Sequence, residues 1–184
     1  MIPQQMTEHQ RHDFARRYVE SAEEWLRKLI HYQLSKTNGE EYLSKGNWKR
    51  DLIEQIIRKK TKNSAQLDRE IDATTFDQAI DILCHPNCWG TEFKVPLHPV
   101  YPFGREEARF FLSQLKDIRN EVSHLRNCSM RQLEKAICYS NDLIDAIKAF
   151  FKDINMQRVY NVPMIVRYVD SIGNESNLNG VLRI

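Results

Sequence analysis

The stretch REEARFFLSQLKDIRNEVSH, residues 105–124, decides how this chain can fold. Its apolar side chains recur every three or four residues, which predicts one amphipathic helix from about Arg105 to His124. The expected buried stripe consists of Ala108, Phe111, Leu112, Leu115, Ile118 and Val122. Because such a helix needs neighbours to cover its apolar side, the sequence around it should contain further helices.

The same period extends from Asp13 to Asn155. It predicts helices from about Asp13 to Lys36, from Trp48 to Lys60, and from Thr75 to a residue before Pro86. We expect the first of them to end at Thr37-Asn38-Gly39 and to bury Phe14, Tyr18, Trp25, Leu29 and Tyr32. The second should set Trp48, Leu52, Ile53, Ile56 and Ile57 on one side. Thr75 and Gln78, and later Ser129 and Gln132, have capping-box spacing, and the second box opens a long helix to about Asn155.

Two segments lack this period. Pro96, Pro99 and Pro102 predict an extended, polyproline-like connection between Cys88 and Gly104, or alternatively a ligand for a proline-recognition domain. From Met164 to Val169 residues alternate as in a strand, and Gly173-Asn174 could turn the chain toward a second strand at Val181 to Ile184. We therefore expect an all-α bundle of four to five main helices over residues 1–157. A small β-rich tail, residues 158–184, should pack on the same domain.

Composition sets the class of protein. With 41% hydrophobic and 28% charged residues the chain is ordinary for a soluble globular domain, and a net charge of +2 permits an anionic partner without requiring one. No apolar run reaches the ~18 residues of a membrane span, and no signal peptide is recognisable. Four sparse cysteines fit a reduced protein better than a disulfide scaffold, so a cytoplasmic location is expected.

The end of the 105–124 helix concentrates chemically active side chains. Arg119, Asn120 and His124 lie within six residues. An arginine that never loses its charge can hold a phosphate, and an imidazole can move a proton near neutral pH. At 100° per residue, Asn120 and His124 share a face opposite the buried stripe, and Arg119 lies at the edge of the stripe. These three groups are a minimal set for cutting RNA without a metal.

The same outer face carries Phe110, Ser113 and Asp117. A large aromatic ring on a polar face suggests that something covers it, and a second copy of the chain is the simplest candidate. We therefore expect Phe110, Ser113 and Asp117 to belong to a dimer interface.

Basic residues supply the expected RNA contacts. Arg126 and Arg131 flank the turn before the helix that begins at Ser129, and the N-terminus of a helix favours a phosphate. Arg58, Lys59 and Lys60 form the centre of the strongest basic cluster. That cluster could follow an RNA backbone, or it could simply be the solvated face of an amphipathic helix.

The pattern Leu-x-x-Ile-Arg-Asn-x-x-x-His, ending the penultimate helix of a bundle, resembles the signature of the HEPN superfamily. The resemblance covers about Asp13 to Asn155 and matches the family motif at Arg119, Asn120 and His124. It implies a metal-independent endoribonuclease, often a toxin of a toxin–antitoxin pair or an antiviral defence effector, with no cofactor. It also implies a homodimer in which two motifs meet in a cleft, and an antitoxin or defence protein as a further partner.

The resemblance further implies a chemistry for each residue. His124 would act as general base or acid, Arg119 would stabilise charge on the phosphoryl oxygens, and Asn120 would orient His124 or contact the phosphate. Attack of a ribose 2′-hydroxyl would leave a 2′,3′-cyclic phosphate and a 5′-hydroxyl.

Other interpretations stay open. Many HEPN-like domains are non-catalytic binding modules for partner proteins or nucleotides, and an Arg and a His at a helix end often just interact with the terminal carbonyls. Arg119 could also pair with Glu121 or Asp117 on its own helix. The segment from Cys84 to Cys88 lacks the usual zinc-knuckle spacing, and a partly buried helix end with two thiols explains it better than a metal site.

Overall fold

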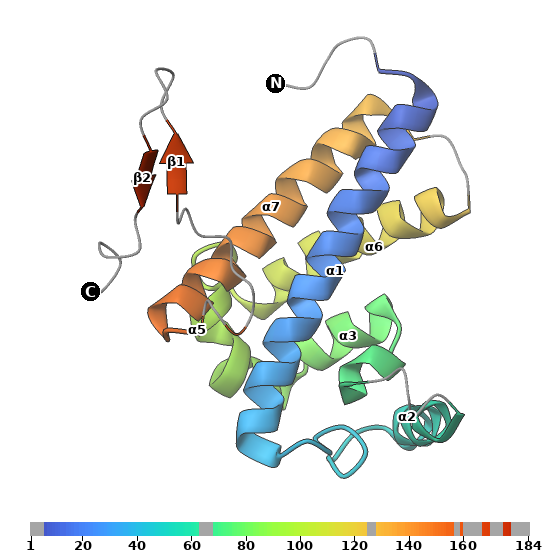
Figure 1. Ribbon diagram of the computed structural model, residues 1–184. Coiled ribbons are helices and arrows are strands. Elements are labelled where there is room, and N and C mark those ends of the chain that lie inside the picture. The colour runs from blue at the N-terminus through green and yellow to red at the C-terminus, as the bar shows by residue number, and fades with distance from the viewer. Residues whose placement is uncertain are drawn as a thin grey trace. The chain divides into compact units, whose positions relative to one another are not determined.

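The computed structural model describes residues 6–62, 68–124, 128–156 and 159, together with the backbone of 167–169 and 175–177. Over these residues the fold is all-α apart from one pair of short strands (Figure 1). The chain divides into two compact units, Met1–Phe150 and Phe151–Ile184. All the described candidate site residues lie in the first unit, as do most of the helices.

Helix α1 (Glu8–Asn38) begins earlier than predicted because a capping box starts it. The Thr7 hydroxyl accepts from the amide of Gln10 at 3.3 Å, and the Gln10 side chain accepts from the amide of Thr7 at 2.9 Å. The helix ends at Gly39, as predicted, where φ of +75° suits a residue without a Cβ.

The buried side of α1 differs from the predicted stripe. Small and aliphatic side chains line it, namely Ala15, Val19, Ala22, Leu26, Leu29 and Ile30, together with Trp25. Phe14 is 46% exposed, so its predicted burial is wrong. The prediction followed the large aromatic rings, whereas small residues at Ala15 and Ala22 let neighbouring helices approach closely.

Helices α6 (Arg105–Ser123) and α7 (Met130–Asp153) confirm the two strongest predictions. The expected capping box opens α7: the Ser129 amide donates to Gln132 Oε1 at 2.8 Å, and the Gln132 amide donates to Ser129 Oγ at 3.2 Å. Helix α6 packs on α1, and α7 runs alongside α1 in the same direction (Figure 1). The ring of Phe111 of α6 packs edge to face on the ring of Tyr139 of α7, with 4.9 Å between the ring centroids, so α6 and α7 are also in contact.

Helix α2 (Arg50–Lys62), the 3-10 turn η1 (Glu70–Ala73) and α3 (Phe76–Leu83) form a second layer. The predicted capping box at Thr75 and Gln78 is confirmed. Ile56 of α2 is fully buried, but Ile57 is 49% exposed, contrary to its predicted place on the apolar side. Neighbouring residues differ by 100° on a helix, so the face of α2 that packs against η1 covers Ile56 but not Ile57.

Glu70 joins this layer together. Its buried carboxylate accepts from the amides of Leu43 at 2.6 Å and Ser44 at 3.1 Å, and from the Ser44 hydroxyl. Lys60 Nζ of α2 lies 3.1 Å from the same group. One carboxylate thus fixes the connection after α1, the last turns of α2, and η1.

The segment with the three prolines is helical up to Leu97, and Pro99 and Pro102 lie in the turns that follow, so the predicted extended connection is wrong. It contains α4 (Pro86–Cys88), the π-helical turn η2 (Trp89–Phe93) and α5 (Lys94–Leu97). Trp89, Phe93 and Leu97 recur every four residues and are buried. Pro96 is tolerated because it lies in the first turn of a short helix, where its missing N–H has no partner to lose.

The second unit contains strands β1 (Arg167–Val169) and β2 (Glu175–Asn177), which pair antiparallel with Arg167 opposite Asn177. The predicted turn at Gly173 and the predicted strand from Val181 lie outside the described residues. Packing of the tail on the helical domain stays a prediction. Among the described helices, none combines the length and the hydrophobicity needed to cross a bilayer.

Candidate active site

The candidate site is a corner where α6 ends and α7 begins. The amide of His124 caps α6 by donating to the carbonyls of Asn120 and Glu121, both at 3.2 Å. Residues 125–127, including Arg126, lie outside the described residues, and the chain is described again from Cys128. The first turns of α1 close this corner, since His12 Nε2 lies 2.5 Å from the Val122 carbonyl and Arg11 Nε donates to the Cys128 carbonyl at 2.9 Å.

Arg119 is anchored on a neighbouring helix. Its side chain is 43% exposed, and its Nε lies 3.9 Å from Glu23 Oε2 of α1. This pairing differs from the alternatives on α6 itself, and the carboxylate of Glu121 instead accepts from Gln132.

Glu23 also connects the site to the core. Its Oε1 accepts from Arg27 Nη2 at 2.5 Å. Arg27 is buried and donates to the carbonyls of Ile71 and Thr74. One carboxylate, 16% exposed, therefore lies between a buried guanidinium and a half-exposed one. This arrangement holds the position of Arg119 without using up its hydrogen-bond donors.

Three polar groups at the corner are available to a ligand. Asn120 and His124 are exposed, one helical turn apart. Within residues 6–62, 68–124 and 128–156, no side chain or carbonyl accepts a hydrogen bond from the Arg119 guanidinium, and the side chains of Asn120 and His124 make none. An arginine fork, an amide and an imidazole thus face solvent from the last two turns of one helix, as the helical wheel predicted.

His12 is a residue that sequence reasoning missed. A carbonyl oxygen only accepts hydrogen bonds, so the nitrogen of His12 that faces Val122 must carry a proton. Its other ring nitrogen lies 3.8 Å from Asp13. The spacing of His12 to Ala15 and Val19 places it on the buried side of α1, a signal that was readable once α1 was known to begin at Glu8.

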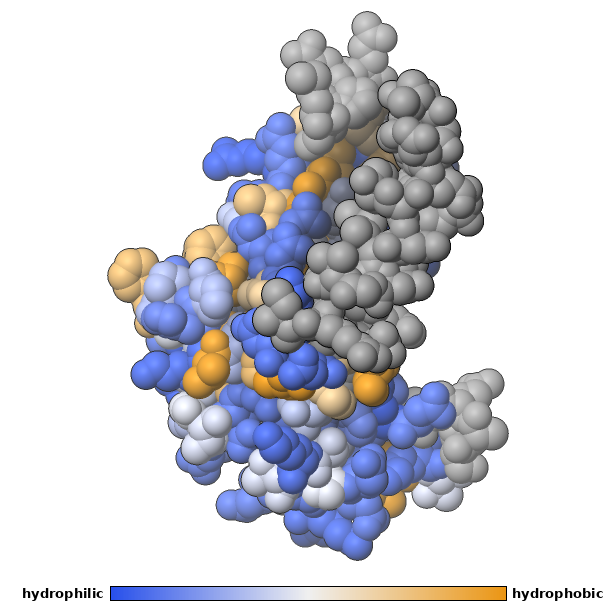
Figure 2. Space-filling view, turned by 60° about the vertical axis from the view of Figure 1, so that its left-hand side comes forward, coloured by the Kyte–Doolittle hydropathy of each residue, from blue (hydrophilic) through white to orange (hydrophobic). Residues whose placement is uncertain are grey.

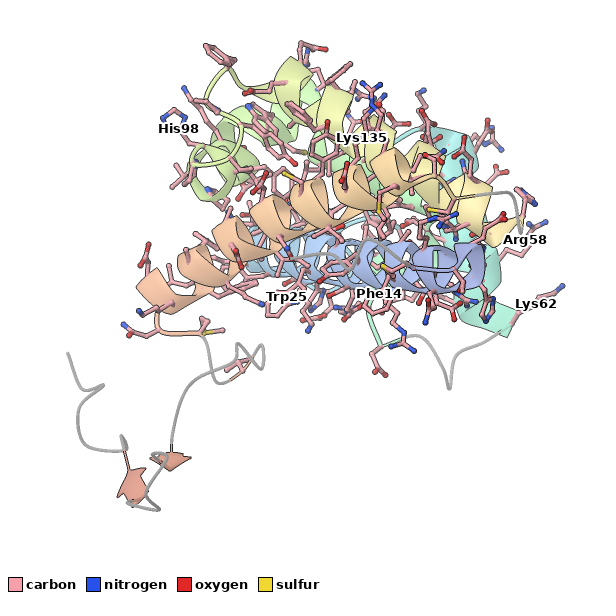
Figure 3. The ribbon with its side chains drawn as sticks, turned by 90° about the horizontal axis from the view of Figure 1, so that it is seen from above. Phe14, Trp25, Arg58, Lys62, His98 and Lys135 are labelled. Atoms are coloured by element: carbon pink, nitrogen blue, oxygen red, sulfur yellow. The ribbon has the colours of Figure 1, made fainter. Side chains whose placement is uncertain are left out.

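The predicted RNA-binding cations are only partly free. Arg131 is exposed in the first turn of α7, and Arg58 is exposed on α2, at the outer edge of the bundle with Lys62 (Figure 3). Lys59 Nζ, however, donates to the Ala73 carbonyl at 2.7 Å, and Lys60 binds Glu70. Both ammonium groups therefore hold α2 against η1, which matches the structural interpretation of this cluster more closely than the functional one.

The predicted dimer face is a stripe along α6. Phe110 is 60% exposed and Asp117 is exposed, whereas Ser113 is half-buried. With Asn120 and His124 these residues recur every three or four positions over about 21 Å of helix. The Phe110 ring stands edge-on to Phe111 at 5.3 Å. On the face in Figure 2, outside the grey atoms, hydrophobic residues form small separate patches among hydrophilic ones.

Over the part of the chain that the structure describes, no three His, Cys, Asp or Glu side chains gather closely enough to hold a metal ion. Cys84 is buried, and burial raises the pKa of its thiol to about 12. His85 Nδ1 accepts from the amide of Asn87 at 3.4 Å. The segment from Cys84 to Cys88 is thus a capped helix end.

Compared with known proteins, the chain matches no family model, no curated protein and no solved structure. The resemblance to HEPN domains therefore depends on the motif residues and their helical context.

Proposed function

We propose that the protein is a metal-independent endoribonuclease: a HEPN-like bundle with a small C-terminal β hairpin, acting in the cytoplasm as a homodimer, as a toxin or defence effector. The observation that carries the proposal is the corner itself. Arg119 is oriented by Glu23 yet keeps its donors free, and His124 stands one turn beyond on the same exposed helix end.

The proposed reaction is transesterification at an RNA phosphodiester. His124 takes the proton of the 2′-hydroxyl while the O2′–P bond forms and the P–O5′ bond breaks. A second imidazole, His124 of the partner subunit, gives a proton to the departing O5′. Arg119 binds the phosphoryl oxygens, where negative charge increases, and Asn120 fixes the phosphate or the ring. The products are a 2′,3′-cyclic phosphate and a 5′-hydroxyl.

The dimer brings two such corners together. We place the twofold axis perpendicular to α6, so that the two copies of α6 run antiparallel across the stripe from Phe110 to His124. For both imidazoles to reach one phosphate, the axis must pass near Asn120 and His124. Each Phe110 then lies far from its counterpart and packs against the partner beyond the end of its α6.

Replacing His124 tests the function directly. Loss of a general acid–base group costs about 100- to 10,000-fold in rate, so His124→Ala should abolish detectable cleavage of total RNA. His98→Ala is the matched control, because His98 is exposed at the end of the bundle opposite Arg58 (Figure 3). EDTA should not inhibit. Cleavage by His124→Ala at the wild-type rate would exclude this assignment.

A second candidate is a non-catalytic module that holds a partner protein such as an antitoxin. The observation favouring it is that Glu23, 3.9 Å from Arg119, offsets part of the charge of that guanidinium in the free protein. This function predicts a dimer that is inert on every RNA tested but co-purifies with its partner protein, and growth on expression that His124→Ala does not alter.

A further inference from the structure

A cavity of about 610 Å³ lies apart from the corner, since none of the corner residues lines it. Its walls come from the connection before α2, the first turns of α2, the end of α3 and the start of α6. Trp48, His85, Asp51, Asn47, Lys49 and Arg109 contribute its polar and aromatic groups. This volume is within the range of sites that bind small molecules. We call it the Trp48 cavity.

The indole of Trp48 is a rigid wall of this cavity. Its Nε1 donates to the Tyr42 carbonyl at 3.0 Å, and its ring meets His85 edge to face at 5.2 Å. Gly46 leaves room for it, because a Cβ at that position would come within 2.4 Å of Trp48 Nε1. The ring is therefore held in place before any ligand arrives, which lowers the entropic cost of binding.

Some of the polar side chains around the ring already have a hydrogen-bond or ion-pair partner, and others do not. Arg109 Nη1 and Asp81 form an ion pair at 2.7 Å, so neither adds net charge. The side chains of Asn47, Lys49 and Asp51 are exposed and line the cavity. None of the three has a hydrogen-bond or ion-pair partner among the described residues. A carboxylate and an amide accept hydrogen bonds from amino groups, and the ammonium of Lys49 attracts an anion.

We propose that the Trp48 cavity binds an unpaired nucleobase of RNA, with the base against the indole of Trp48 and the attached phosphate near Lys49. An aminated base fits the set of groups best, because Asp51 and Asn47 can accept from its exocyclic amino group. Aromatic side chains beside cations are the usual platform for single-stranded RNA. The inference rests on the proposed ribonuclease function in naming RNA as the source of the base.

Adenosine 5′-monophosphate is a suitable probe, because it carries the base and the phosphate but cannot be cleaved. It should bind wild-type protein and His124→Ala equally, which separates this site from the catalytic corner. Trp48→Ala should weaken binding on the order of 10- to 100-fold, the effect of losing one stacking ring. Gly46→Ala should also weaken it by displacing the indole, and Arg16→Ala, at an exposed residue of α1 outside the cavity, should leave it unchanged. Ribose 5-phosphate lacks the base, so it should bind the wild-type protein no more tightly than it binds Trp48→Ala.

One measurement needs no variant of the cavity. In nuclear magnetic resonance of the wild-type protein, adenosine 5′-monophosphate should shift the indole N–H signal of Trp48 and leave those of the buried Trp25 and Trp89 in place. No saturable shift at millimolar concentrations, or equal shifts with ribose 5-phosphate, would overturn the inference. RNA cleavage that depends on His124 would still support the proposed function in that case, whereas base binding without any cleavage would refute only the catalytic proposal.

Discussion

Glu70→Gln should destabilise the protein by about 2–4 kcal/mol at neutral pH. Glu70 is 3% exposed, and its carboxylate accepts from two amides and one hydroxyl and pairs with Lys60. Hydrogen bonds to a buried charged group contribute about 1.5–3 kcal/mol, and the neutral amide loses this charge assistance while Lys60 loses its partner. For a chain of this size the loss corresponds to a fall in Tm of roughly 5–15 °C.

The effect should depend on pH in a defined direction. Burial raises the pKa of Glu70, but the hydrogen bonds from Ser44 and Leu43 and the ammonium of Lys60 outweigh it, so the pKa lies below its ordinary value. A carboxyl with a depressed pKa stabilises the fold fully above its unfolded-state pKa of about 4.3 and loses that contribution as the pH falls through the folded-state pKa. The stability gap between wild type and Glu70→Gln should therefore shrink as the pH falls below about 4.

Urea unfolding at pH 7 and at pH 3 measures both effects. Glu54→Gln is the matched control, because the Glu54 carboxylate pairs with Arg50 at 2.7 Å in solvent, where side chains are 61% and 90% exposed. Its removal should cost under about 0.5 kcal/mol at either pH. If Glu70→Gln costs no more than Glu54→Gln, or costs the same at both pH values, the ionised carboxylate of Glu70 does not hold this layer together.

Two further predictions concern the candidate site. Asn120→Cys should form a disulfide between two protomers under mild oxidation and Phe110→Cys should not, because only Asn120 lies near the proposed twofold axis. Gel electrophoresis without reductant detects the linked dimer. A disulfide in Phe110→Cys but not in Asn120→Cys would place the axis elsewhere. His12→Ala removes the donor to the Val122 carbonyl and should lower kcat for RNA cleavage about tenfold with KM unchanged, since it displaces the helix end that carries His124. His12→Gln, which retains a donor, should recover most of the rate, and an unaltered kcat in His12→Ala would show that this contact does not position His124.

Local signals explain which parts of the fold were predictable. Helices α6 and α7 have regular apolar spacing and a capping box at Ser129, and both features act over four residues. The start of α1 was missed because its first turns are polar, although Thr7 and Gln10 carry the same capping signal. Around Pro96 the three prolines predicted an extended chain, although Trp89 and Phe93 have the four-residue spacing of a helix.

The candidate site divides in the same way. Exposure of Asn120 and His124 follows from the angular position of each residue on one helix, so the wheel predicted it. The contact of His12 with Val122 joins residues 110 positions apart, and the pairing of Arg119 with Glu23 also joins two helices. Such contacts depend on how helices pack against one another, which periodicity within each helix does not specify. The same limit explains why Lys59 and Lys60 seemed free in the sequence but bind η1.

The contacts of Arg11 and His12 also set when the corner can exist during synthesis. Both side chains leave the ribosome before the carbonyls that they bind, because Val122 and Cys128 follow His12 and Arg11 by 110 and 117 residues. A nascent or truncated polypeptide that stops before these residues has no assembled corner, whatever helices it has already formed. For the proposed ribonuclease, this means that the RNA of the cell is not cleaved until the chain has been made beyond Cys128.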